Sequence, residues 1–397
     1  MMPKLKHIVI DVETTVTPRH LPWIEGAKLV SLHLKTEDKP PKAWLFNHPE
    51  STVSFTRCVQ EIQSELDEAE ILVNQNLKFD MHWFRWLGLR VDHLKLHCTQ
   101  IAEYLLQNQK IIMPSLTKLC EIHGVPGKLD KVKELWDAGY ETDEIPAETL
   151  VPYGNQDVVA TEAVYMAQLT RIQNQGLGAL CRVQFAAMRM FGRAEYNGLN
   201  INCDKLQQQS DQYAEELKKI EQELDAIAEG QIDNWSSPDQ KSCFFFGGSY
   251  ATKITKADYD ALSPELQSSY EIEKEGRIWL KAKRRVKGLG FTPPKGSETK
   301  KPGIYSTGSG ILAGLRCRTA QQRNVLKLIA DRSRKAKLKS TYLDGLQKKV
   351  SDDGLVHPKY NLSTTITGRS SSSDPNGQNF PRAKTGPVKS AIETRFK

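Results

Sequence analysis

Short apolar runs alternate with segments of helical periodicity over about the first 175 residues. The run HIVIDVE at 7–13 is continuous and β-branched, which is typical of a buried strand. Three similar runs indicate further strands of one sheet: KLVSLHL (28–34), AWLF (43–46) and ILVNQN (71–76). Amphipathic helical spacing follows at 58–69, 79–89 and 148–175. Strands that alternate with helices predict an α/β fold for this part of the chain.

The rest of the chain has a predominantly helical pattern. Helical spacing continues through residues 184–198 and 203–230, and Gly230 closes the second of these segments. Pro, Gly and Lys cluster at 287–303, which indicates a flexible loop or hinge. A basic segment at 322–350 predicts one more helix.

The charge is distributed unevenly along the chain. The formal net charge is +7, yet residues 274–349 hold 21 Lys and Arg against four Asp and Glu. Residues 1–273 hold 27 basic against 40 acidic side chains. A solvated helical face is the ordinary explanation of one basic run, but a block of this length favours binding to a polyanion, most simply a nucleic acid.

The seven cysteines are scattered and odd in number, and no two form a CxxC pair. This pattern argues against a disulfide framework and a zinc site, and it favours a reducing cytoplasm. The first 15 residues contain one short apolar run followed by acids, which resembles neither a signal peptide nor a membrane span. We therefore expect a soluble cytoplasmic protein without a membrane partner.

Four acidic residues stand at positions suited to metal chemistry. Asp11 and Glu13 end the first strand and, being two residues apart, share one of its faces. Asp80 lies in NLKFD at a junction of strand and helix, and Asp157 lies in YGNQD on a later helix. Each signal alone is weak, because Asp80 could cap its helix and Asp157 could be an exposed helix acid.

Together, the order and spacing of these acids resemble the three motifs of the DEDD superfamily of 3′–5′ exonucleases, in its tyrosine-containing branch. The resemblance implies two Mg²⁺ ions, which Mn²⁺ can replace, with Asp11 bridging both, Glu13 and Asp157 on the first and Asp80 on the second. Tyr153, one helical turn before Asp157, would orient the attacking water. Position 152 is Pro, where the histidine branch has His. Asn76 is a weaker candidate for substrate contact.

The tail TGRSSSSDPNGQNFPR (367–382) resembles the TGR-x-SS-x-x-PN-x-QN-x-P motif of family A DNA polymerases, although Gly377 replaces the usual Leu. The segment NWSSPDQKSCFFFGG (234–248) is similar to the base of that family's thumb. The resemblance implies that three donors test base-pair geometry in the minor groove of primer–template DNA: Arg369, Gln378 and Asn379. The basic block would grip duplex phosphates through Arg332, Arg334, Lys335 and Lys337.

By this resemblance, residues 1–178 form a ribonuclease H-like 3′–5′ exonuclease domain. Residues 179–349 form a mainly helical, basic thumb and linker, and residues 350–397 begin a palm. The family's later palm motifs, DYS-x-x-E and HDE, do not occur in the sequence, and RSRKAKLK (332–339) offers no R-x3-K followed by Tyr at the spacing of the fingers helix.

The sequence therefore predicts the proofreading exonuclease and DNA-binding portion of a family A DNA polymerase. A second polypeptide would carry the remaining palm and the fingers. The location would be the cytoplasm, which is the host's if a phage encodes the chain. Two alternatives remain open: an RNase D-like exoribonuclease, and an inactive DNA-binding truncation product.

Overall fold

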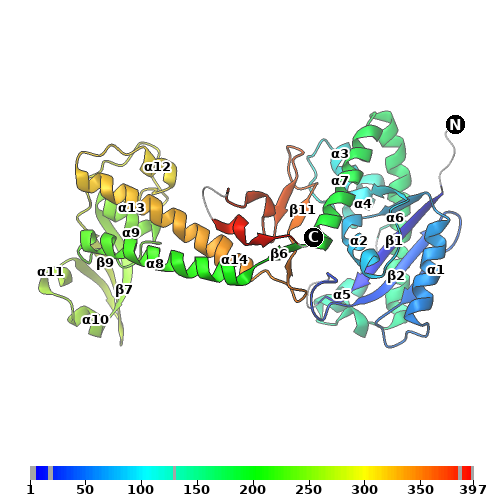
Figure 1. The fold of residues 1–397 in the computed structure, drawn as a ribbon, viewed down its shortest axis with the longest axis horizontal. Coiled ribbons are helices and arrows are strands. Elements are labelled where there is room, and N and C mark those ends of the chain that lie inside the picture. The colour runs from blue at the N-terminus through cyan, green and yellow to red at the C-terminus, as the bar shows by residue number, and fades with distance from the viewer. Residues whose placement is uncertain (1–5, 17–20, 128–130, 383–386, 395–397) are drawn as a thin grey trace. The chain divides into compact units, whose positions relative to one another are not determined.

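The computed structural model describes residues 6–16, 21–127, 131–382 and 387–394. The chain divides into two compact units (Figure 1). The first unit comprises residues 1–202 together with 346–397, and the second comprises residues 203–345.

A five-stranded sheet of order β3-β2-β1-β4-β5 forms the centre of the first unit. The neighbours β1–β2 and β2–β3 are antiparallel, and β1–β4 and β4–β5 are parallel. The four predicted strands are present, and only the short fifth strand of this sheet was not predicted. The strands are β1 (His7–Thr14), β2 (Leu29–Thr36), β3 (Lys42–Leu45), β4 (Ile71–Asn74) and β5 (Lys95–Cys98).

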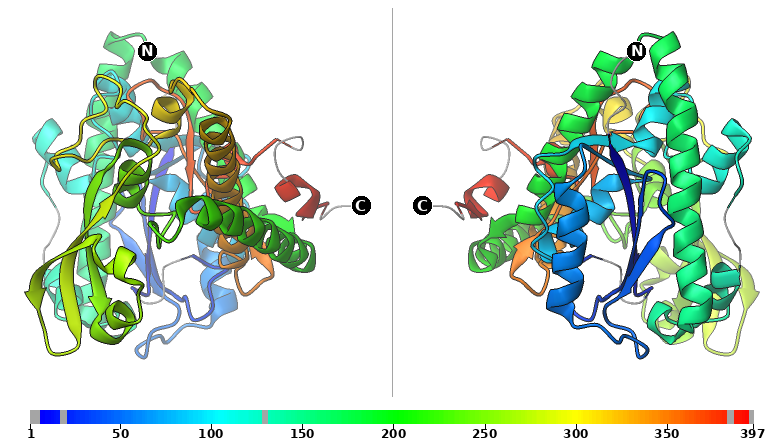
Figure 2. Two further views of the ribbon diagram at one scale, coloured as in Figure 1. Left: turned by 90° about the vertical axis from the view of Figure 1, so that its left-hand side faces the viewer. Right: turned by 90° about the vertical axis from the view of Figure 1, so that its right-hand side faces the viewer.

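Side chains alternate between the two faces of β1, and this alternation decides where its acids point. Ile8 and Ile10 belong to a core built with the helices α1 and α2. Val9 packs on the opposite face with Val158 and Tyr165 of α6. Asp11 and Glu13 share the parity of Val9, so they face α6. The helices lie on the two faces of the sheet (Figure 2), with bounds α1 (Phe55–Asp67), α2 (Leu77–Trp86) and α6 (Ala147–Asn174).

Shorter helices complete this unit. Four of them and one 3-10 turn surround the sheet: α3 (Thr99–Leu106), α4 (Leu116–His123), α5 (Lys131–Asp137), η1 (Thr142–Glu144) and α7 (Gly178–Asn197).

The last 52 residues pack with the first unit through two small sheets. In the first, β6 lies between β10 and β13, and in the second β11 pairs with β12. The elements are β6 (Leu199–Ile201), β10 (Leu355–Val356), β11 (Lys359–Asn361), β12 (Ser371–Ser373), η3 (Gly377–Asn379), η4 (Pro387–Ala391) and β13 (Ile392–Glu393).

Glu195 of α7 ties this tail to the first unit. Its buried carboxylate accepts hydrogen bonds from Lys78 and from His82 of α2, the latter at 2.9 Å, and from the backbone N–H of Tyr360 at 2.5 Å. The two compact units meet at 202/203 and 345/346, while the domain boundaries expected at 178/179 and 349/350 stay a prediction. The units divide there because α7 and the tail share buried polar contacts with α2.

Helices and one antiparallel sheet build the second unit. Its core joins Leu224 of α8, Phe244 and Phe245 of α9, and Val325 and Ile329 of α13. The helices are α8 (Cys203–Ala228), α9 (Pro238–Phe246), α10 (Lys256–Asp260), α11 (Pro264–Gln267), α12 (Ser309–Ala313), α13 (Ala320–Lys337), η2 (Leu338–Leu343) and, at its boundary, α14 (Asp344–Gln347).

The sheet of the second unit was not predicted. It has the order β7-β9-β8 and interrupts the expected mainly helical segment. Exposed and buried positions alternate strictly along WLKAKRRV of β9, which is the period-2 signal of a strand that has one face in solvent. The strands are β7 (Gly248–Thr255), β8 (Tyr270–Glu275) and β9 (Trp279–Val286).

Candidate functional site

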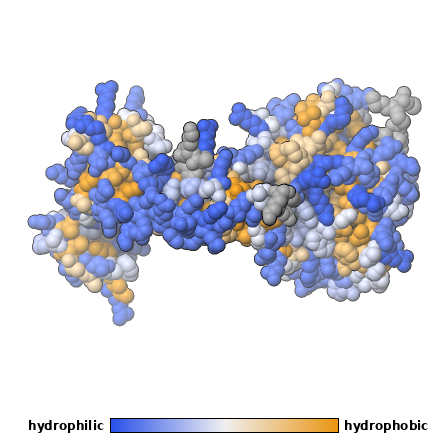
Figure 3. All heavy atoms as spheres, in the orientation of Figure 1, coloured by the Kyte–Doolittle hydropathy of each residue, from blue (hydrophilic) through white to orange (hydrophobic). Residues whose placement is uncertain are grey.

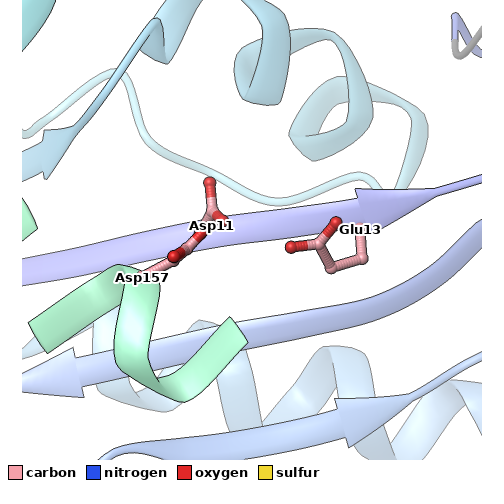
Figure 4. A group of neighbouring side chains, drawn as sticks. All are labelled: Asp11, Glu13 and Asp157. Carbon is pink, nitrogen blue, oxygen red and sulfur yellow. The ribbon is translucent and has the colours of Figure 1, made fainter. Parts of the chain in front are cut away.

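Three of the predicted acids meet on the α6 face of the sheet. Asp11 and Glu13 come from β1 and Asp157 comes from α6, and each offers a carboxylate oxygen within 4.8 Å of the other two (Figure 4). Glu13 and Asp157 are buried, with 8% and 2% exposure. Hard divalent cations such as Mg²⁺ and Mn²⁺ prefer carboxylate oxygens, so this donor set fits such an ion.

Asp80 reaches β1 from the first turns of α2. The strand β4 pairs with β1 only as far as Val9, and beyond it the Asp80 carboxylate accepts a 3.1 Å hydrogen bond from the N–H of Val12. Val12 lies between Asp11 and Glu13, so the hydrogen bond holds Asp80 beside these acids. Burial, and then the negative charge of Asp11, raise the pKa of Asp80 well above its ordinary value.

We expect Asp80→Asn to stabilise the protein when divalent cations are removed with EDTA. The fold favours the protonated form of Asp80, because its folded pKa exceeds the unfolded value near 3.8. The cost of ionisation therefore appears as the pH rises above 3.8 and grows until the pH passes the folded pKa. Each pKa unit corresponds to about 1.4 kcal/mol. Asparagine removes this cost because it cannot ionise. Thermal melting between pH 5 and pH 8 measures the resulting difference in stability between Asp80→Asn and the parent.

The exposed Asp92, at 68% exposure, supplies the control variant Asp92→Asn, which should gain no stability in this pH range. Adding Mg²⁺ should stabilise the parent more than Asp80→Asn. A variant that is no more stable than the parent in EDTA would show that Asp80 does not strain the fold.

Tyr153 lies on the helix that carries Asp157, and Asn76 directly precedes the helix that carries Asp80. Tyr153 lies one turn before Asp157, and its buried ring packs edge-on against Trp136, with centroids 5.8 Å apart. Asn76 precedes α2 with a left-handed backbone (φ 57°), and its side chain does not cap the helix. It lines a small cavity that also contains Lys78 and Tyr360. Their proposed roles on water and substrate stay predictions.

The four basic residues named on α13 do not share one environment. Arg332 is 9% exposed, and its guanidinium donates to Glu221 at 2.7 Å, to the carbonyl of Trp235 at 3.2 Å and to Ser236 at 3.0 Å. Lys335 is held between Glu216 and Asp331, each at 2.9 Å. We therefore assign Arg332 to the interior of the second unit and not to a phosphate contact.

A different set of bases lines the exposed side of α13. At about 100° per residue, Arg332 lies on the helix side opposite position 323. The exposed stripe consists of Arg323, Lys327, Arg334 and Lys337. Arg334 pairs with Asp331 at 2.6 Å, and the other three have no ion pair with any residue that the structure describes. Hydrophilic residues cover α8 and the end of α13 on the face shown in Figure 3. We call these four residues the α13 stripe.

The predicted minor-groove donors lie on the exposed surface of the tail. Arg369, Gln378 and Asn379 are all exposed. The side chain of Gln378 donates to Ser370 Oγ at 3.0 Å, which places it next to the residue that follows Arg369. Asn376 accepts the backbone N–H groups of Gln378 and Asn379, each at 3.2 Å, and so fixes the turn that carries them.

The sequence resembles polymerases. Residues 266–396 match the family model described as DNA polymerase family A. DNA polymerase I of Synechocystis sp. is 28% identical over 317 residues, which cover 78% of this chain and 27% of the relative. The DNA polymerase of Escherichia phage T5 is 25% identical over 347 residues, which cover 82% of this chain and 36% of the relative. The chain thus spans about a quarter to a third of the length of these relatives.

The fold also has a solved counterpart. A structure titled as the POL domain of Pol1 from M. smegmatis, in complex with DNA primer-template and dNTP, matches 98% of this chain and 55% of its own chain. The TM-score is 0.66 at 18% sequence identity, which is a likeness of fold. Among the described residues, no helix has the length and apolar character needed to cross a membrane.

Proposed function

Since this chain belongs to DNA polymerase family A, we propose that its first unit removes nucleotides from DNA 3′ ends by metal-dependent hydrolysis, and that the chain binds primer–template DNA. The observation that carries the hydrolytic part is the convergence of Asp11, Glu13 and Asp157 on one face of the sheet. The sheet, with three antiparallel strands followed by two parallel ones, supports the proposal of a ribonuclease H-like exonuclease domain.

The residues divide the chemistry among them. Asp11, Glu13, Asp157 and, once it has lost its proton, Asp80 would hold divalent cations. Such cations activate the attacking water and stabilise the negative charge on the leaving 3′ oxygen. Tyr153 would orient the water, and Asn76 would contact the substrate. Burial of Glu13, Asp80 and Asp157 strengthens the charge interactions at the site.

The test is digestion of 3′-terminal nucleotides. Purified protein with Mg²⁺ or Mn²⁺ should shorten a 5′-labelled single-stranded DNA from its 3′ end and release mononucleotides, and EDTA should stop the reaction. An RNA strand of the same sequence separates the proposal from the RNase D-like alternative. Digestion of RNA in preference to DNA would overturn our assignment of the substrate.

DNA binding by the second unit rests on the α13 stripe. Its four side chains lie on one side of a single helix and are exposed, which suits contacts with successive phosphates along one backbone. Such contacts are independent of sequence and depend steeply on salt, because each one releases counterions.

Replacing all four residues of the α13 stripe by glutamine should flatten the salt dependence of duplex binding. Each lost phosphate contact lowers the slope of log K against log salt by about 0.9, so the loss of all four contacts should lower the slope by about 3.6. Fluorescence anisotropy between 50 and 200 mM salt measures it. The control replaces four exposed bases of the first unit by glutamine: Arg57, Lys118, Lys131 and Lys133. Equal slopes for the two variants would contradict the proposed role of the stripe.

A further inference from the structure

His33 lies beside the candidate metal site on the neighbouring strand. In the β1–β2 register it stands directly opposite Asp11, and Ser31 stands opposite Glu13. Residues that pair across antiparallel strands point to the same face, so His33 and Ser31 face α6 together with the two acids. His33 is fully buried, with 0% exposure.

Two hydrogen bonds fix the imidazole of His33. Its Nε2 lies 2.9 Å from Ser31 Oγ and its Nδ1 lies 3.1 Å from Asn155 Oδ1. An amide oxygen only accepts, so Nδ1 donates to Asn155 and Nε2 accepts the hydroxyl proton of Ser31. Burial lowers the pKa of His33 to about 4, in keeping with a neutral ring. The ring therefore joins β2 to a residue of α6 that lies two positions before Asp157.

Gly154 brings the backbone of α6 against this ring. A Cβ built at Gly154 would lie 2.3 Å from Nε2, 2.4 Å from Cδ2 and 2.6 Å from Cε1 of His33. Such distances are far below van der Waals contact, and the ring is fully buried and held by two hydrogen bonds. Glycine inside a helix costs about 1 kcal/mol relative to alanine, so its place in α6 calls for a packing reason.

We propose that His33 and Gly154, together with Asn155, form a positioning contact for the metal site. The contact sets how closely α6 approaches the sheet at the turn between Tyr153 and Asp157. The separation between the Asp157 carboxylate and the acids of β1 then follows from the thickness of one imidazole ring. The inference rests on the proposed function, because it assumes that these carboxylates hold divalent cations.

The test is Gly154→Ala, alone and combined with His33→Ala. The methyl group of Gly154→Ala should push α6 outward and weaken Mn²⁺ binding by at least tenfold. EPR of Mn²⁺ in the absence of DNA measures this binding. Removing the ring should make room for the methyl group, so the double variant should recover most of the Mn²⁺ affinity that the single variant loses. Gly192→Ala in α7 is the matched control, since its Cβ would come no closer than 3.3 Å to the side chain of Lys78 and 3.5 Å to that of Arg85.

A crystal structure of each variant supplies a readout without metal. Asp157 should be displaced from Asp11 and Glu13 in Gly154→Ala and restored in the double variant. If Gly154→Ala does not fold, the double variant should still fold. A double variant that also fails to fold would contradict the proposed contact. Parent-like Asp157 geometry in Gly154→Ala, or a double variant no better than the single one, would overturn the inference. Equal Mn²⁺ binding by the parent and Asp11→Ala would instead overturn the proposed function.

Discussion

Replacing Asp11 or Asp157 by alanine is expected to abolish metal-dependent digestion of single-stranded DNA. Each variant removes one of the three carboxylates that converge within 4.8 Å, and the two that remain come short of the charge and the ligands that divalent cations need. A loss of about 10³-fold or more, which corresponds to about 4 kcal/mol in the activation free energy, should follow. Rates of 3′ digestion at saturating Mg²⁺ measure the effect.

Two further variants on α6 calibrate this result. Glu148→Ala removes an exposed acid from the first turn of the same helix and should leave the rate unchanged. Tyr153→Phe keeps the ring that packs against Trp136 and should retain residual activity, because the cations still activate water when its orienting group is lost. Full activity in Asp11→Ala would remove the carboxylates from the mechanism.

The strand at the centre of the fold could be predicted because its alternation is local. In HIVIDVE the apolar run identifies a buried strand, and the parity of Val9, Asp11 and Glu13 places both acids on one face. The partnership with Asp157 depends on the packing of α6, which lies about 145 residues further along the chain, so only the family motif indicated it. Nothing in the sequence marked His33, whose role depends on the register between β1 and β2.

The basic block shows where a count of charges is insufficient. The total of Lys and Arg between 274 and 349 indicated a polyanion partner. It did not distinguish basic side chains that face solvent from those that are buried. Helical periodicity could have done so, because Arg332 follows Val325 and Ile329 by seven and three residues and shares their buried side. The same test would have selected Arg323 and Lys327, which the charge count did not identify.

The β7–β9 sheet was missed for a related reason. Its basic strand WLKAKRRV was interpreted through its charge, although every second residue is buried. Buried Arg284 shows why a basic strand can sit there, since its guanidinium reaches Asp233 and the carbonyl of Gly230. Long basic side chains can therefore form part of a core when their donors find acceptors within it.

The second large effect concerns nucleotide addition. We expect the 397-residue chain alone to extend no primer, because its sequence lacks the motifs that carry the family's palm aspartates, and two-metal phosphoryl transfer needs those carboxylates. We propose that adding a polypeptide with the remaining palm and the fingers restores the reaction, since it supplies these carboxylates.

Primer extension with an Asp11→Ala chain tests this expectation, because the substitution prevents digestion from hiding the products. The chain alone should give no extension with any dNTP mixture. A palm–fingers polypeptide that begins at the DYS-x-x-E motif of a relative should co-elute with it in size exclusion and yield templated products. The control is the same mixture with the aspartate of that motif changed to alanine, since the complex should then form without polymerising. Templated extension by the 397-residue chain alone would contradict the expectation, and a mixture that neither co-elutes nor polymerises would contradict the proposed partner.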